Sequence, residues 1–189
     1  LSSRLSEKNV HTLFELQRML KRKSDYPRIS SELNLSEEYL TVLNREVNSY
    51  ESKPTGLEKL NVFSDIEMQV LESHGIKNSK DLYLRALEEN QRDELASATE
   101  IPLWKIQKGL ILCDLVRING VGPQYANILY KMGIKGVSDY LITPSEVILE
   151  KYQEANGTEQ LSKAKLGIKD VDYCKRFCMN LDKEVQLSD

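Results

Sequence analysis

The stretch Ile118-Asn119-Gly120-Val121-Gly122-Pro123 carries the most structural information in this sequence. Two glycines flank one apolar residue directly before a proline, a pattern typical of a tight turn that leads into a helix. We expect Val121 to fill the space between the helix before this turn and the helix after it. The free backbone N–H groups of the second helix then face outward at the positive end of its dipole, which predicts a phosphate-binding hairpin.

The surroundings of this hairpin occur a second time, in an earlier part of the chain. Gly75-Ile76-Lys77 aligns with Gly133-Ile134-Lys135, and in the same register Leu60-Asn61-Val62-Phe63-Ser64 aligns with residues 118–122. A separate similarity links three segments, which begin near residues 34, 100 and 167 and continue with apolar residues at spacings of three, four and seven. Such spacing is that of one buried helical face. The repetition predicts helical units that stack side by side.

The sequence predicts an all-α fold, because no segment combines two-residue alternation with β-branched residues. Helices are expected over 8–23, 36–50, 64–74, 79–90, 103–116, 123–132, 137–141, 144–155 and 168–182. The repeat divides the chain into a helical half-repeat (1–53), a degenerate unit (54–113), a unit with the intact hairpin (114–182) and a tail (183–189). Pro54 and Gly56 indicate a joint between the first two segments, and Gly157-Thr158 indicates a second loop.

The hairpin resembles the helix-hairpin-helix family, whose pattern is apolar–x–Gly–apolar–Gly–x–x–x–Ala–x–x–(Ile/Leu). The residues that fill this pattern are Ile118, Gly120, Val121, Gly122, Ala126 and Leu129. The longer pattern Gly-Val-Gly-Pro-x-Tyr-Ala, followed by Gly-Ile-Lys and a further helix, resembles the bacterial family catalogued as domain of unknown function 4332. The likeness covers roughly residues 57–180 and implies tandem helix-hairpin-helix repeats of the SAM-like kind.

The resemblance also implies contact with a DNA or RNA backbone without sequence specificity. The candidate nucleic-acid contacts are Gly120, Val121, Gly122, Gln124, Tyr125, Arg117, Lys131 and Lys135. Tyr125 stands where many DNA-binding members carry Lys or Arg. The upstream copy has Val62 and Ser64 in place of the glycines and acidic residues after them, so its helix start is expected to be satisfied internally.

Two functions remain open at this point. One is a binding module for nucleic-acid backbone; the other is a helical scaffold for a partner protein or a second copy, with a purely structural hairpin. The net charge of −3 means that nucleic-acid binding must rest on a local arrangement. Two or three phosphate contacts would give weak, salt-sensitive binding.

Neither catalysis nor a cofactor is expected. His11 and His74 stand alone, the three cysteines show no paired metal-ligand spacing, and no nucleotide or hydrolase motif is present. Asp139 is the only acid placed like a glycosylase aspartate, but its equivalence to Asp81 in the upstream copy favours a helix-terminus role. Core positions are expected for Cys174 and Cys178.

Three further expectations concern surface and location. We expect Trp104 to pack in the core and the Lys21-Arg22-Lys23 run to face solvent. The cysteines favour a reducing compartment and hence a cytoplasmic location, and no apolar run reaches the length of about 20 residues that a membrane span requires. The chain begins with Leu1 and lacks a signal-peptide pattern, which favours a fragment or trimmed chain.

Overall fold

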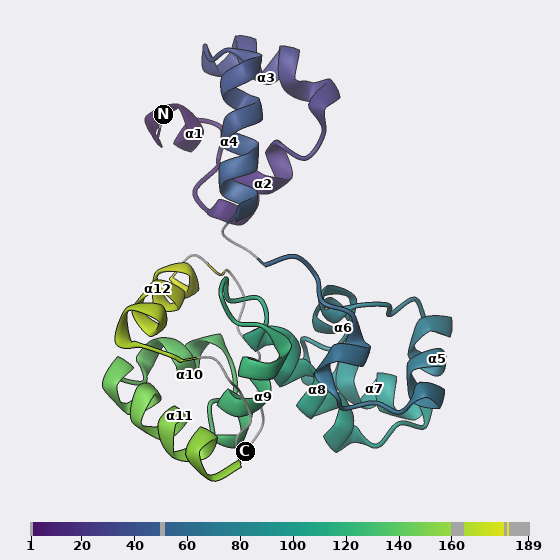
Figure 1. The fold of residues 1–189 in the computed structure, drawn as a ribbon. Coiled ribbons are helices and arrows are strands. Elements are labelled where there is room, and N and C mark those ends of the chain that lie inside the picture. Colours follow the sequence, from purple (N-terminus) through teal and green to yellow (C-terminus); the bar gives the residue numbers. More distant parts are fainter. Residues whose placement is uncertain (1, 50–51, 160–164, 180, 182–189) are drawn as a thin grey trace. The chain divides into compact units, whose positions relative to one another are not determined.

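The computed structural model describes residues 2–49, 52–159, 165–179 and 181. Within these residues the regular elements are helices, with one isolated bridge between Gly56 and Asn78, so the expected all-α fold is confirmed (Figure 1). The predicted tail, residues 183–189, lies outside the described residues. The elements are α1 (Ser2–Ser6), α2 (Leu13–Met19), η1 (Lys23–Asp25), α3 (Tyr26–Leu33), α4 (Glu37–Ser49), η2 (Leu57–Leu60), α5 (Asp65–Ser73), α6 (Ser79–Arg85), α7 (Glu89–Thr99), α8 (Leu103–Leu115), α9 (Pro123–Lys131), α10 (Val137–Ile142), α11 (Ser145–Glu159) and α12 (Ile168–Cys178).

The helices form two compact units, one built from α1 to α4 and the other from η2 to α12. In the first unit, α2 and α3 pack against α4. This unit has an apolar core of its own, made of Leu5, Leu16, Leu20, Tyr26, Ile29, Leu33, Leu40 and Val47. The Lys21-Arg22-Lys23 run is exposed, as expected.

Helix α8 forms the centre of the second unit, because α6, α7 and α9 all pack against it (Figure 1). Its residues 109–115 are all buried, which a helix surrounded by others requires. Gly109 permits the close approach of Phe63, since an added Cβ would lie 2.6 Å from Cζ of that ring. Helix α11 packs on α9, and α12 packs on both α10 and α11. The hairpin between α8 and α9 therefore starts directly from the core.

Two connections in this second unit make the same hydrogen bonds at equivalent positions of the repeat. After α5, the amide of Ile76 donates to the carbonyl of Leu71 at 3.0 Å; after α9, the amide of Ile134 donates to the carbonyl of Leu129 at 2.9 Å. The glycine before each isoleucine has a positive φ, +80° in one copy and +86° in the other. This is the left-handed helix end that favours glycine.

The two aspartates that follow these connections also play the same part. Asp81 accepts a hydrogen bond from the amide of Lys77 at 3.0 Å, and Asp139 accepts one from the amide of Lys135 at 2.8 Å. Both carboxylates satisfy backbone donors at a helix start. The expected helix-terminus role of Asp139 is confirmed.

Several predicted helix boundaries are wrong. The helix expected over 8–23 is only α2 (Leu13–Met19), and helices α3 and α7 were not predicted. Helix α7 is polar over most of its length, and Arg92 takes a buried position by donating to the carbonyls of Ala86 and Leu87. A hydrophobic pattern cannot reveal such a helix. The loop expected at Gly157-Thr158 is absent, because α11 continues to Glu159.

The prediction for Trp104 is also wrong. Its side chain is 59% exposed. Two residues later, Ile106 begins the buried face of α8, so Trp104 lies on the opposite side of the helix. The Nζ atom of Lys105 lies 5.8 Å from the centre of its ring.

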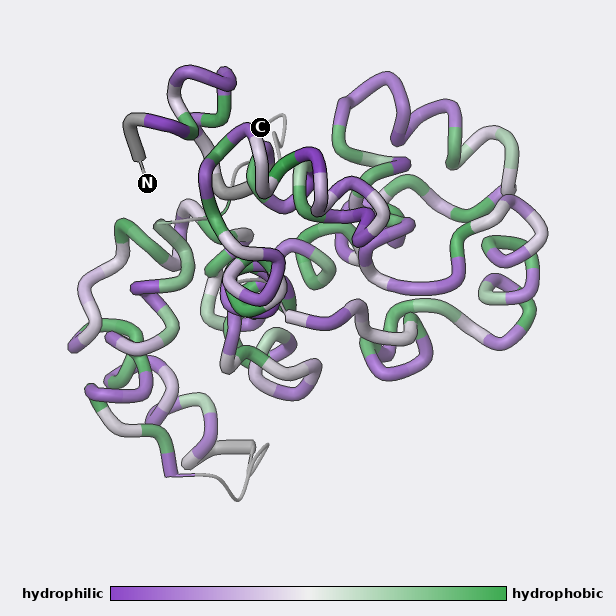
Figure 2. Tube along the Cα trace, turned by 90° about the horizontal axis from the view of Figure 1, so that it is seen from above, coloured by the Kyte–Doolittle hydropathy of each residue, from purple (hydrophilic) through white to green (hydrophobic). Residues whose placement is uncertain are grey.

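Hydrophobic and hydrophilic residues alternate along the helices of both units (Figure 2). Among the described residues, none of the helices combines the length and the apolar character that crossing a bilayer requires. Cys113, Cys174 and Cys178 are buried and unpaired, which confirms the core positions predicted for Cys174 and Cys178.

Candidate nucleic-acid interface

The hairpin between α8 and α9 is a short turn closed by one backbone hydrogen bond. The amide of Val121 donates to the carbonyl of Ile118 at 2.9 Å, and both side chains are buried. Between them, Gly120 has φ +94°, a conformation that other residues rarely adopt. Val121 thus anchors the turn between the two helices, as its sequence position predicts.

The second glycine starts α9. Gly122 is the N-cap, with extended backbone (φ −83°, ψ 172°), and Pro123 is the first helical residue. The carbonyl of Gly122 accepts the first helical bond, from Ala126 at 2.9 Å. Its own exposed amide has no acceptor among the residues that the structure describes. An exposed residue with an unbonded backbone donor therefore stands at the positive end of the helix dipole.

The two glycines face different surroundings. A Cβ on Gly120 would lie 2.9 Å from the Sγ of Cys174, so α12 closely approaches that residue. A Cβ on Gly122 would have no atom within 4 Å. The open side of the hairpin is thus the Gly122 side, at the start of α9.

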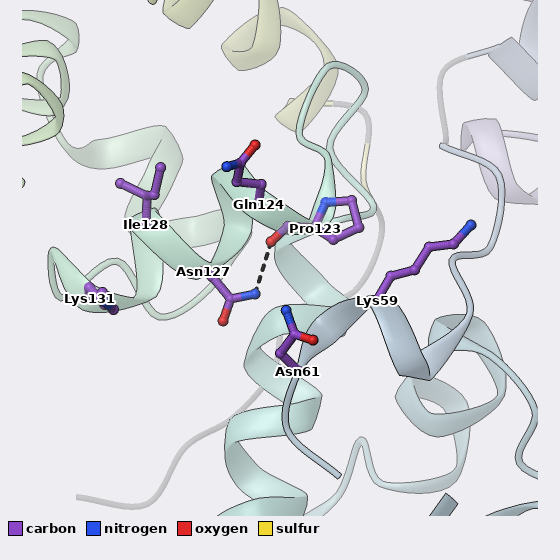
Figure 3. A pocket seen from close by; sticks show the side chains of 7 residues that line it. All are labelled: Lys59, Asn61, Pro123, Gln124, Asn127, Ile128 and Lys131. Carbon is purple, nitrogen blue, oxygen red and sulfur yellow. Dashed lines mark hydrogen bonds between the residues drawn. The ribbon is translucent and has the colours of Figure 1, made fainter. Parts of the chain in front are cut away.

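A groove of about 500 Å³ lies along the adjoining face of α9 (Figure 3). Its lining consists of Lys59 and Asn61, from η2 and its end, and of Pro123, Gln124, Asn127, Ile128 and Lys131, from α9. The two lysines lie at opposite ends of the group, with the two asparagines between them (Figure 3). Among the residues that the structure describes, those lining the groove include no carboxylate, and its two charged groups, Lys59 and Lys131, are cationic.

Asn127 joins the two walls of the groove. Its Nδ2 atom donates to the carbonyl of Leu60 at 3.1 Å and to that of Pro123 at 3.0 Å. The first bond fixes η2 against α9, and the second lies within α9 (Figure 3). Lys59, Asn61 and Asn127 were not among the residues predicted from sequence. No local motif marks them, because the groove forms only when two segments that are distant in the sequence pack together.

Of the predicted contacts, Gln124 and Lys131 line the groove. Lys135 is exposed but lies beyond the opposite end of α9, where its amide bonds Asp139. It is therefore remote from the free amide at the start of the helix.

Arg117 takes part in an interior cluster. Its Nη1 atom donates to Oδ1 of Asp114 at 2.8 Å, and its guanidinium lies 4.3 Å from the ring centre of Tyr83. The carboxylate of Asp114 is 1% exposed and also accepts the amide of Val137 at 2.8 Å. Asp114 thus joins α8 to α10, while Arg117, with only 12% of its side chain exposed, lies between Asp114 and the Tyr83 ring of α6. We do not include Arg117 in the site.

Tyr125 likewise points inward. Its ring makes edge contacts with Tyr140, at 6.5 Å between ring centres, and with Tyr152, at 5.7 Å. Burial raises the pKa of the Tyr125 hydroxyl above its ordinary value. The ring supports α9 from the interior, so only the backbone of this residue can serve the hairpin.

The upstream copy of the hairpin has a different helix start. Ser64 and Glu67 form a capping box, in which Ser64 Oγ accepts the amide of Glu67 and Glu67 accepts the amide of Ser64 at 2.7 Å. Lys105 donates to both carboxylate oxygens of Glu67, at 2.7 and 2.8 Å. This interaction, together with the bonds to Ser64, lowers the pKa of Glu67. The expectation of an internally satisfied helix start is confirmed.

The family model described as "Domain of unknown function (DUF4332)" matches residues 62–177, which is more than half of the chain. The chain belongs to this family. Comparisons with curated proteins and with solved structures find no match.

In this DUF4332 member the matched range includes the hairpin, α9 and all of α12 except its last residue. Lys59 and Asn61 lie just before it, so one wall of the groove is built from residues outside the matched range.

Proposed function

We propose that this protein binds the sugar-phosphate backbone of DNA or RNA without reading base sequence, as a non-enzymatic module. The observation that carries the proposal is that Gly122, an exposed residue at the start of α9, has an amide with no acceptor among the described residues. Backbone donors at a helix N-terminus are suited to a phosphate oxygen, because the hydrogen bond and the helix dipole act in the same direction.

The adjoining groove supports this proposal through its charge. Lys131 lies seven residues after Gln124 on the same face of α9, a separation of about 10 Å along a helix. A backbone that places one phosphate at Gly122 can therefore bring another toward Lys131, while Lys59 lies across the groove. These local cations offset the net charge of −3 of the whole chain.

The fold that we propose for residues 54–178 is a tandem pair of helix-hairpin-helix units. The paired hydrogen bonds after α5 and α9 support it, because they fall at equivalent positions of the sequence repeat. In the upstream unit Glu67 occupies the donors that would serve a phosphate and adds negative charge. We therefore propose one working hairpin, not two.

A second candidate function is the binding of a protein partner. The observation in its favour is the exposure of two apolar side chains near the Glu67–Lys105 ion pair: Ile66 is 74% exposed and Trp104 is 59% exposed. Exposed aromatic residues are frequent in protein interfaces. This surface belongs to the upstream unit and does not involve Gly122.

The test measures affinity for single- and double-stranded DNA and for RNA at about 50 and about 200 mM salt. Two to three phosphate contacts predict a loss of about 10- to 40-fold over that range. Gly122→Ala places a methyl group beside the free amide and should weaken binding about tenfold or more. Gly157→Ala is the matched control, since a Cβ there also meets no atom within 4 Å. Salt-insensitive or absent binding by the wild type, or equal affinity of both variants, would refute the proposal.

A further inference from the structure

An exposed aromatic side chain lies beside the hairpin. Tyr173 of α12 is 47% exposed, although its neighbour Cys174 is buried. A Cβ on Gly120 would lie 3.8 Å from Cδ1 and 3.9 Å from Cε1 of this ring. The ring of Tyr173 therefore lies close enough to Gly120 to touch a Cβ placed there, and it is also partly open to solvent.

The position of the Tyr173 ring is fixed by the packing of its helix. Val171, Cys174 and Cys178 form the buried side of α12, and Tyr173 lies on the other side. Phe177, one turn later, makes an edge contact with the Tyr173 ring, at 4.9 Å between ring centres and 63° between planes. Part of the Tyr173 side chain remains open to solvent beside Phe177.

Basic residues accompany this ring on the same side of α12. Lys169 and Arg176 are exposed and stand four residues before and three residues after Tyr173, so all three share one face. The two acids of this helix have partners in the fold: Asp170 accepts the amide of Gly167 at 2.9 Å, and Asp172 accepts the hydroxyl of Ser145 at 2.6 Å. Both carboxylates are exposed, and Asp170 stands three residues before Tyr173 on the same side of α12. The surface around the Tyr173 ring therefore holds two basic groups, Lys169 and Arg176, beside one acidic group.

We infer that Tyr173 stacks on an unpaired base of a single-stranded nucleic acid whose backbone the hairpin holds, and that Lys169 and Arg176 contact the phosphates beside it. The inference rests on the proposed function and makes it more specific. An aromatic ring can stack on any base, so the contact is compatible with binding that ignores sequence. The bases of a duplex are stacked inside the helix and cannot reach this ring, so single strands are the favoured ligand.

The test uses a fluorescent thymidine oligomer of about 12 nucleotides, free or annealed to its complement, and measures anisotropy with the full chain. The wild type should bind the single strand about tenfold more tightly than the duplex. Tyr173→Leu should lower single-strand affinity about tenfold and leave duplex affinity unchanged, because it removes the stacking ring but keeps the bulk. Tyr173→Phe should retain the preference. Tyr39→Leu is the matched control, since Tyr39 is 43% exposed on α4 of the other unit.

The two proposals fail in different ways. If Gly122→Ala weakens both ligands while Tyr173→Leu weakens neither, the hairpin binds backbone but the stacking inference is overturned. If the wild type binds neither ligand, both proposals are overturned. A crosslink from a 5-iodouridine oligomer that maps to Tyr173 in the wild-type chain is expected even if Tyr173→Leu proves unstable, and its absence under binding conditions counts against the inference.

Discussion

A methyl group added to Gly120 would lie 2.9 Å from the Sγ atom of Cys174. Together with its φ of +94°, this contact explains why the first glycine of the hairpin is needed by the fold. Gly122 has neither restriction, since its φ is −83° and its surroundings are open. The fold requires the first glycine, whereas the second has room for a side chain and an amide with no acceptor among the described residues.

Gly120→Ala is expected to lower the free energy of unfolding by about 2 kcal/mol or more. The positive φ costs about 1–2 kcal/mol for a residue with a Cβ, and the close contact with Cys174 adds to it. Urea denaturation measures the loss. In a Cys174→Ala background the cost of Gly120→Ala should fall toward the φ contribution alone, whereas Gly122→Ala should change stability by less than about 1 kcal/mol. Equal losses for the two glycine variants would contradict this account.

Lys59→Gln and Lys131→Gln are each expected to weaken nucleic-acid binding and to reduce the slope of log affinity against log salt by close to 1. Both lysines line the groove along α9, and each phosphate contact contributes about 0.9 to the slope of log affinity against log salt. Titrations at several salt concentrations measure the slope. Lys77→Gln is the control, because Lys77 lies in the upstream copy, at the position equivalent to Lys135. If Lys77→Gln reduces the salt slope as much as the two groove variants do, the groove is not part of the binding site.

Asp114→Ala is expected to destabilise the second unit by about 3–5 kcal/mol. The substitution leaves the partly buried Arg117 guanidinium without its ion pair and the Val137 amide without its acceptor. Thermal or urea unfolding measures the loss. Arg117→Met should also destabilise the protein while leaving the salt slope of binding unchanged, since Arg117 faces the interior. A stable Arg117→Met variant with a smaller slope of log affinity against log salt would show that Arg117 contacts the nucleic acid.

The Glu67–Lys105 ion pair should make stability depend on pH in the acid range. Its partners lower the pKa of Glu67 below the ordinary value of 4.5, so its stabilising effect is complete above about pH 4.5 and is lost as the pH falls through the folded-state pKa. Glu67→Gln should therefore be less stable than the wild type by about 1 kcal/mol at neutral pH. The difference should shrink toward pH 3. If the stability difference between the wild type and Glu67→Gln stays the same from pH 7 to pH 3, the Glu67–Lys105 ion pair is not its cause.

The three cysteines should react slowly with thiol reagents in the native protein. Burial raises the pKa of all three thiols, that of Cys178 to about 12, and only the thiolate reacts. Alkylation at pH 8 followed by mass spectrometry should show little modification before unfolding and all three sites modified in urea. Rapid native labelling of Cys174 would mean that α12 separates readily from Gly120.

The sequence by itself determined the features that depend on residues close together in the chain. The Gly120-Val121-Gly122 turn, the buried Val121 and the helix-terminal roles of Asp81 and Asp139 all follow from backbone conformation and from hydrogen bonds between near neighbours in the sequence. The all-α class follows from apolar spacing for the same reason.

Tertiary structure alone decided the features that join distant segments. Lys59 meets α9, Arg117 lies over the ring of Tyr83, and Tyr173 approaches Gly120, each between segments that are well separated in the sequence. Helical periodicity predicts which face of a helix is apolar. It does not predict which neighbouring helix covers that face, or which basic side chain is buried. Those outcomes depend on how α8, α9 and α12 pack, because burial and ion pairing are properties of the assembled core.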